Sequence, residues 1–262
     1  MHVPVLLEEV IQCLDPKPGR KYIDATANGG GHTKALRDMG AEVLSIEWDP
    51  ELAKQIGAVS DSYINIVNVA KEHGFDQCDG VLFDLGFSSW HIEESGRGFS
   101  FLRDEPLDMR YSHSGRTAAD ILNNYSEEEI ARIFKEYGEE RFDGRIANAI
   151  VKARPIYTTF QLVELIKGVV PTRRVKINPA TRVFQALRIE VNHELENIQK
   201  GLEGAMKVVR VGGKIAVITF HSLEDRIVKK FFHKSKLIRP QWAEIKNNRR
   251  ARSAKLRVAE KI

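Results

Sequence analysis

The sequence predicts an α/β fold, in which a Rossmann-like parallel sheet carries helices on its faces and is interrupted by a helical insertion. Three observations predict it. Short apolar strands alternate with helical stretches over roughly the first hundred residues, and a glycine-rich turn follows the first strand. Strand periodicity then vanishes from about Glu105 and returns at Lys214. We therefore expect a sheet domain made of residues 1–104 and 196–262, and an inserted helical domain at residues 105–195.

The composition is typical of a globular protein. The chain has 262 residues, of which 42% are hydrophobic, so a sizeable core can form. It contains no apolar run of membrane-spanning length and no signal-peptide pattern, so we expect a cytoplasmic protein without a membrane partner. The two cysteines, Cys13 and Cys78, lack metal-ligand spacing, and we expect buried thiols and no metal site.

The charge is spread unevenly along the chain. The net charge is +4, yet the stretch from Lys229 to Ile262 holds twelve Lys and Arg residues against Glu244 and Glu260, a net +10. The other 228 residues therefore carry −6. A basic terminus of this kind favours a polyanionic partner, with nucleic acid first, although a merely solvated basic face fits equally well.

The first strand is expected at Lys21–Asp24. It leads into the turn Asn28–Gly31, and a helix then runs from His32 to about Met39. A strand, turn and helix in this order present backbone N–H groups to a ligand. No Gly-Lys-Ser/Thr follows the glycines and the pattern G-x-G-x-x-G is not met, which excludes the phosphate loops of nucleoside triphosphate and dinucleotide sites.

The second strand, Glu42–Ile46, leads directly into Glu47. A carboxylate at the tip of the second strand can accept hydrogen bonds from both ribose hydroxyls of an adenosine. Together with the glycine turn, Glu47 indicates an adenosine ligand whose other end is not a pyrophosphate, and S-adenosylmethionine is such a ligand. The alternative to a ligand site is a tight strand–helix turn at the glycines, with Glu47 as a solvated acid. Asp49-Pro50 then opens the next helix with an N-cap and a proline.

The third and fourth strands are predicted at Tyr63–Val67 and Gly80–Leu85, and the fourth is apolar enough to be buried. Asp84 stands at the carboxyl end of the fourth strand, where open parallel sheets gather their ligands. The loop that follows, Gly86–His91, is therefore a candidate active-site loop.

Caps, helical spacing and alternation predict the remaining elements. Ser126–Glu129 forms a capping box, and Asn178-Pro179 opens a long helix whose apolar stripe extends to Leu195. A fifth strand leads to His221, and the last strand is predicted at Leu256–Glu260, with Gln241–Ile245 as a candidate hairpin partner. The fifth strand covers residues 211–220, and further helices are predicted at 4–14, 143–153, 159–170 and 223–232.

Eight stretches, in order along nearly the whole chain, carry a resemblance to a known family. They are residues 2–9 (HVPVLLEE), 24–32 (DATANGGGH), 84–89 (DLGFSS), 97–101 (RGFSF), 106–110 (PLDMR), 178–189 (NPATRVFQALRI), 220–226 (FHSLEDR) and 250–253 (RARS). The sequence resembles the bacterial 16S rRNA cytosine-N4 methyltransferase family, also called MraW or RsmH. Asn28 stands where that family usually has glycine, and His91 where it usually has glutamine. Asn tolerates a left-handed backbone, so we expect the turn to survive.

The resemblance implies a class I methyltransferase fold with S-adenosylmethionine as cofactor. The implied substrate is a cytidine in the decoding region of 16S rRNA, so the small ribosomal subunit is the expected partner. Both a monomer and a homodimer remain open. Carried over by motif position, the cofactor-binding residues are Gly30, Gly31 and His32 at its amino-acid end, Glu47 at its ribose, and Asp84 and His91 along the remainder.

The chemistry of such a reaction assigns a role to Asp84. The cytosine amine is a poor nucleophile because its lone pair is delocalised into the ring. An acceptor that pulls on one N4 hydrogen would localise that pair and help to remove the proton. Asp84 is the candidate for this catalytic role, and cofactor binding alone is its alternative role. The cytidine must be single-stranded or flipped out, since N4 is paired in a duplex.

Several residues are candidates for substrate contacts. Ser88 and Ser89 can supply hydroxyls, and His221 can contact base or phosphate, unless it is a strand-end histidine bonded to the backbone. Arg182 and Arg188 lie six residues apart on the long helix, so one can pair internally while the other reaches phosphate. In the basic terminus, the residues expected to hold rRNA phosphates are Arg249, Arg250, Arg252 and Lys255.

Three other functions share some of these features. A nicotinamide oxidoreductase would share the strand–glycine–helix start but needs the missing G-x-G-x-x-G. A non-catalytic RNA-binding ribosome-assembly protein would keep the basic terminus but would not need Glu47 and Asp84 at strand tips. A DNA cytosine-N4 methyltransferase would usually show Ser-Pro-Pro-Tyr after the fourth strand, where this chain has Asp84-Leu85-Gly86-Phe87.

Overall fold

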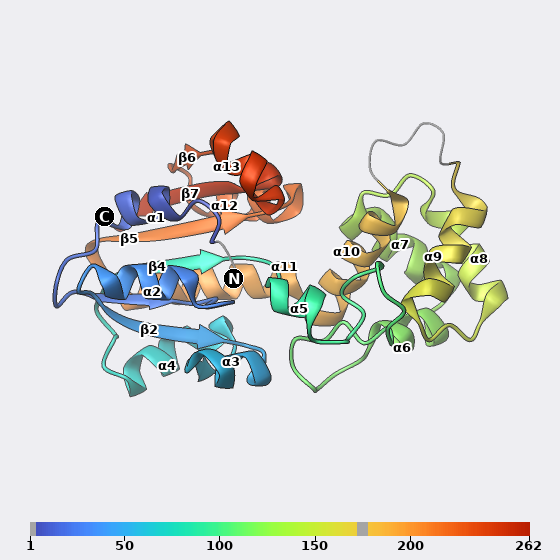
Figure 1. Cartoon of the computed structure of the whole chain (residues 1–262), viewed down its shortest axis with the longest axis horizontal. Coiled ribbons are helices and arrows are strands. Elements are labelled where there is room, and N and C mark those ends of the chain that lie inside the picture. The colour runs from blue at the N-terminus through green and yellow to red at the C-terminus, as the bar shows by residue number, and fades with distance from the viewer. Residues whose placement is uncertain (1–3, 172–177) are drawn as a thin grey trace. The chain divides into compact units, whose positions relative to one another are not determined.

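The computed structural model describes residues 4–171 and 178–262. His2 and Val3 of the opening motif lie outside the described residues. The chain forms two compact units, a sheet unit made of Met1–Ser88 with Leu195–Ile262 and a helical unit made of Ser89–Glu194 (Figure 1). The division into separate domains at residues 104/105 and 195/196 stays a prediction. None of the described helices is both long and apolar enough to cross a membrane.

The sheet unit is built on a seven-stranded sheet with the order β3-β2-β1-β4-β5-β7-β6. The first five strands in this order run parallel, and β7 runs antiparallel between β5 and β6. This topology confirms the predicted α/β fold of the class I methyltransferase type. The strands are β1 (Lys21–Asp24), β2 (Glu42–Glu47), β3 (Val59–Ser60), β4 (Cys78–Asp84), β5 (Val209–Thr219), β6 (Lys236–Ile238) and β7 (Lys255–Glu260).

Each face of the sheet packs against its own apolar core. Successive residues of a strand point to opposite faces, so Val81 and Phe83 of β4 enter one core and Leu82 enters the other. On the first face lie α4 (Ile66–Glu72), α11 (Glu194–Val208) and α12 (Ser222–Phe231). On the second face lie α1 (Leu7–Leu14), α2 (Gly31–Asp38) and residues of α13 (Trp242–Asn247) and of the 3-10 helix Arg249–Ser253.

The predicted third strand, Tyr63–Val67, is wrong. The strand beside β2 is the two-residue β3, and the predicted stretch forms a 3-10 turn, Tyr63–Asn65, followed by α4. The Ser62 side chain accepts the N–H of Ile64 and starts the turn. Short apolar runs do not distinguish strand from helix, and here the buried positions Ile66, Val69 and Ala70 follow helical spacing.

The predicted hairpin partner of the last strand, Gln241–Ile245, is also wrong. β6 pairs with β7 instead, and the predicted stretch begins helix α13. Pro240 has no N–H to donate to a strand ladder, so the strand ends before it. Ile245 then packs against the core of the second face, which a helix allows as well as a strand does.

The helical unit contains no strand of the sheet among its described residues. Helix α10 ends at Asn192 rather than at Leu195, because His193 adopts a left-handed backbone with φ 50°. Capping boxes at Ser126 and Thr158 begin two of its helices, the first as predicted. The helices are α5 (Ser89–Glu93), α6 (Ala118–Asn124), α7 (Glu127–Gly138), α8 (Asp143–Ala153), α9 (Thr159–Val169), α10 (Pro179–Asn192) and the first residue of α11.

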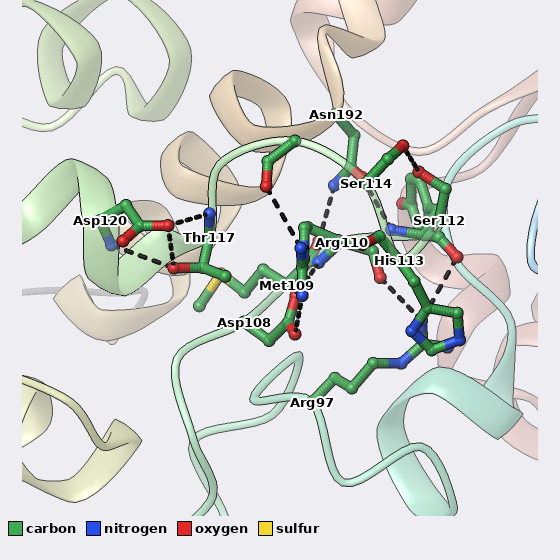
Figure 2. A network of polar contacts seen from close by, with 12 residues as sticks. Arg97, Asp108, Met109, Arg110, Ser112, His113, Ser114, Thr117, Asp120 and Asn192 are labelled. Carbon is green, nitrogen blue, oxygen red and sulfur yellow. Dashed lines mark hydrogen bonds and ion pairs between the residues drawn. The ribbon is translucent and has the colours of Figure 1, made fainter.

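A polar network fixes the loop before α6 against α10 (Figure 2). Arg110 donates to both oxygens of Asp108, at 2.7 and 2.9 Å, and Arg97 donates to the carbonyl of Arg110. Asn192 of α10 donates to the carbonyl of Met109, a residue with φ 61°. The motif at residues 106–110 therefore has a structural task in holding this loop.

Candidate active site

The turn after β1 approaches its neighbours too closely for side chains. A Cβ at Gly31 would lie 2.3 Å from Cγ of Pro4, so only glycine fits there. Gly30 and Asn28 have φ of 74° and 50°, the left-handed region that glycine and asparagine tolerate best. The predicted survival of the turn with Asn28 is thus confirmed. Helix α2 begins directly at Gly31 and carries His32 and Thr33 on its buried side.

Asn28 joins the tips of two strands to the turn. Its backbone N–H donates to Oε2 of Glu47 at 2.9 Å, and its side-chain amide donates to the carbonyl of Asp84 at 3.0 Å. The sequence indicated only the backbone role of this residue. Its polar side chain at a position expected to hold glycine is the signal that could have indicated the second role.

Glu47 is buried at the tip of β2. Its two carboxylate oxygens accept the backbone N–H groups of Asn28 and Asp49, at 2.9 and 3.0 Å. Burial raises the pKa of Glu47 to about 7, although these two hydrogen bonds act to lower it. Each carboxylate oxygen can accept a second hydrogen bond, so Glu47 can take two further donors, as a ribose diol would supply.

Asp84 is buried at the carboxyl end of β4. Its Oδ1 has no hydrogen-bond partner among the residues that the structure describes. Its Oδ2 lies 3.4 Å from the Asn28 amide and 3.7 Å from Nδ1 of His32. Burial raises the pKa of Asp84, and the neighbouring charges of His32 and Arg250 act to lower it. An unpartnered buried carboxylate oxygen is costly, which indicates that a ligand completes this site.

The contacts of His32 specify where a proton lies. Nε2 is 3.0 Å from the carbonyl oxygen of Val5, which can only accept, so Nε2 carries a hydrogen. Nδ1 faces Oδ2 of Asp84 at 3.7 Å, which is too long for a hydrogen bond but close enough for an electrostatic contact.

Arg250 joins this site from the other end of the sequence. Its guanidinium donates to the carbonyl of Phe87 and lies over the ring of Phe220, 5.8 Å from the ring centre. Its positive charge acts to lower the pKa of Asp84. Ser88 is buried beside Phe87, and Arg252 is exposed in the 3-10 helix that contains Arg250. Substrate contacts by these three residues stay predictions.

His221 caps helix α12. Its side chain accepts the N–H of Glu224 at 3.4 Å, and its Nε2 lies 3.1 Å from Oε1 of the same residue. The side chain of Glu224 returns a hydrogen bond to the backbone N–H of His221, which completes a capping box. His221 therefore has the backbone-bonded role that was weighed against substrate contact, and the contact itself stays a prediction.

Three predicted site residues belong to the helical unit. Ser89 is the first residue of α5, and His91 is buried among the rings of Trp90, Phe99 and Tyr111. Arg188 is buried and donates to both oxygens of Glu194, at 2.7 and 2.9 Å. Arg182 is bound within the unit as well, since it donates to the carbonyl of Glu139 at 3.2 Å and lies 3.8 Å from the buried carboxylate of Glu140. Both arginines of the long helix therefore pair internally. Roles for Ser89, His91 and Arg188 toward a ligand stay predictions.

Comparison with known proteins decides the family. The sequence profile of the MraW methylase family matches residues 1–237. The chain belongs to the MraW methylase family. Its relatives include three proteins named ribosomal RNA small subunit methyltransferase H. The identities are 44% with that of Deinococcus deserti (100% of this chain, 94% of the relative), 46% with that of Dictyoglomus thermophilum (100% and 97%) and 46% with that of Thermosipho melanesiensis (100% and 98%).

Among solved structures, an rRNA methylase from Streptococcus thermophilus aligns with 98% of this chain and 93% of its own length. The identity is 9% and the TM-score 0.46, and we infer nothing from so distant a match. Membership in the MraW family makes the chain a methyltransferase, and S-adenosylmethionine is its methyl donor. The residues fit this cofactor, because the unpartnered oxygen of Asp84, the spare acceptor sites of Glu47 and the close turn at Gly31 lie at adjacent strand tips.

Proposed function

We propose that this protein methylates the exocyclic N4 of a cytidine in the decoding region of 16S rRNA. The small ribosomal subunit is its proposed partner, and the cytoplasm is its proposed location. The observation that carries the proposal is Asp84, a buried carboxylate with an unpartnered oxygen at the carboxyl end of β4. The names of the relatives support the ribosomal RNA substrate, and the motif resemblance supports N4 of cytidine.

Residues of the sheet unit would hold the methyl donor. Glu47 would accept the ribose hydroxyls, and the turn at Gly30 and Gly31 with the start of α2 would surround the amino-acid end. When bound, S-adenosylmethionine supplies an electrophilic methyl group on a sulfonium, so the protein needs mainly to align the amine with it.

Asp84 would act on the amine. Its Oδ1 accepts a hydrogen bond from N4–H, which localises the nitrogen lone pair, and the same oxygen takes the proton once N4 has gained the methyl group. His32 would face Asp84 from the other side, with Nδ1 at 3.7 Å from Oδ2. Arg250 keeps positive charge near the carboxylate and favours its anionic form before the reaction.

The proposal is tested on its expected substrate. Small subunits from cells that lack this protein are incubated with the purified protein and methyl-labelled S-adenosylmethionine, and the modified nucleoside is mapped by mass spectrometry. We expect one labelled N4-methylcytidine in the decoding region. Label in another base would contradict the proposed substrate, as would label at N4 of cytidines in DNA that is supplied in place of the subunits. Protein-free 16S rRNA in a parallel reaction shows whether the assembled subunit is required.

A further inference from the structure

One aromatic side chain of the sheet unit is strongly exposed within basic surroundings. Trp242, the first residue of α13, is 76% exposed, whereas Trp48 and Trp90 are only partly exposed. The ammonium group of Lys246, one helical turn further, lies 5.7 Å from the centre of the Trp242 ring. The indole ring offers a large flat apolar face for stacking, and a cation lies next to it.

Helix α13 is held firmly from its inner side. Oε1 of Glu244 accepts the backbone N–H of Leu6 at 2.7 Å, and Ile245 packs against an apolar core. Glu244 is the single acidic residue between positions 233 and 255, where the chain carries eight Lys and Arg residues. Because that acid is bonded inward, the outer side of α13 presents Trp242 and Lys246 without a nearby negative side chain of its own segment.

Exposed arginines flank this helix on both sides. Arg239 precedes it by three residues, and Arg249 and Arg252 belong to the 3-10 helix that packs against it. We call Trp242 with Arg239, Lys246, Arg249 and Arg252 the basic platform. An exposed ring with one cation beside it and further exposed cations on the adjoining segments suits a nucleotide, whose base stacks and whose phosphate is anionic.

The basic platform is joined to the active site by short links. Arg250, between two platform arginines, donates to the carbonyl of Phe87 beside Ser88. Leu6, which is bonded to Glu244, follows Val5, whose carbonyl is bonded to His32. The platform therefore belongs to the same rigid part of the sheet unit as Asp84.

We propose that Trp242 stacks on an unpaired base of the RNA substrate close to the target cytidine, while the platform cations bind the adjoining phosphates. The identity of the RNA rests on the proposed function, but the recognition of unpaired RNA does not. Single-stranded RNA suits the platform better than a duplex, since the faces of paired bases are covered by their neighbours.

The test compares two RNA probes, an unstructured strand of about 12 nucleotides and a blunt-ended duplex of the same strand length. We expect Trp242→Ala to weaken binding of the unstructured strand roughly 5- to 150-fold, since stacking contributes about 1–3 kcal/mol per base. Trp242→Phe should keep most of the affinity. Binding of the duplex should change little. Val211→Ala, which shortens another strongly exposed apolar side chain of the sheet unit, is the matched control and should bind as wild type.

Tryptophan emission gives a second readout. The unstructured strand should quench the emission of the wild-type protein, and most of this quenching should be absent in Trp242→Phe. Unchanged affinity in Trp242→Ala would overturn the proposal and leave the ring as a contact for a protein partner. An equal loss on the duplex would overturn it as well. If methyl transfer to subunits fails while the Trp242-dependent binding holds, only the proposed function is contradicted.

Discussion

Glu194 in the helical unit and Asp84 in the sheet unit are both buried carboxylates, and their surroundings differ. Glu194 receives two hydrogen bonds from Arg188 and a third from the hydroxyl of Tyr111. Asp84 keeps one oxygen without a partner among the described residues, and its other oxygen accepts a 3.4 Å hydrogen bond from the Asn28 amide. Burial is therefore no guide to function by itself. A carboxylate whose acceptor sites are filled stabilises the fold, and one with an open site is arranged for a ligand.

The largest expected effect separates the two roles weighed for Asp84. Asp84→Asn keeps the shape of the side chain but cannot take a proton, so we expect methyl transfer to fall roughly 100- to 10,000-fold. The affinity for S-adenosylmethionine, measured by calorimetry, should change much less than the turnover. A loss of affinity with the turnover intact at saturating cofactor would leave Asp84 a cofactor ligand only.

The same comparison predicts a loss of stability in the helical unit. Arg188→Ala leaves the charge of Glu194 buried without its ion-pair partner, and breaking such a pair costs about 3–5 kcal/mol. Urea denaturation followed by circular dichroism measures the free energy of unfolding. Arg132→Ala, which removes an exposed arginine of an i,i+4 pair on α7, should change it by less than about 0.5 kcal/mol. Equal stability of Arg188→Ala and wild type, with weaker RNA binding, would restore Arg188 as a phosphate contact.

Glu47 should matter for the cofactor rather than for turnover. Glu47→Ala removes a charged acceptor for the ribose hydroxyls, so we expect binding of S-adenosylmethionine to weaken by roughly 1.5–3 kcal/mol. Calorimetry on the variant measures this directly. Unchanged affinity would show that the ribose does not lie at Glu47.

The raised pKa of Glu47 predicts a dependence of cofactor affinity on pH. The ribose hydroxyls donate to the anionic form, and the pKa is about 7 in the free protein. Affinity should therefore rise as the pH increases from 6 to 8, by about tenfold at most. The same pKa shift gives folding stability the opposite dependence on pH. The raised pKa stabilises the folded protein fully at pH values below 4.5, the ordinary pKa of the group, and this stabilisation is lost as the pH rises through about 7. Glu47→Gln should have a flat affinity profile over this range, and a slope as steep as that of wild type would assign the titration to another group.

Site residues and helix caps could be predicted from the sequence where a short local pattern identifies them. Glu47 and Asp84 were found because each directly ends an apolar strand, and Asp49 and Ser126 because caps have short patterns. The bond from Arg250 to Phe87 joins residues 163 positions apart, and no local pattern encodes it. The partner of Arg188 likewise depends on where Glu194 lies after the break at His193.

The smallest effect concerns the four basic residues predicted to hold rRNA phosphates, which the structure divides into two pairs. Lys255 donates to Asp225 at 2.8 Å and Arg250 to the carbonyl of Phe87, whereas Arg249 and Arg252 are exposed. Each phosphate contact on single-stranded RNA contributes about 0.7 to the slope of log affinity against log salt. Arg249→Ala with Arg252→Ala should therefore flatten that slope by about 1.4, while Lys255→Ala leaves it nearly unchanged. The control, Lys229→Ala with Lys230→Ala, removes the same charge from exposed positions on α12. If both double variants flatten the slope equally, the RNA responds to net charge alone and makes no specific contact with Arg249 and Arg252.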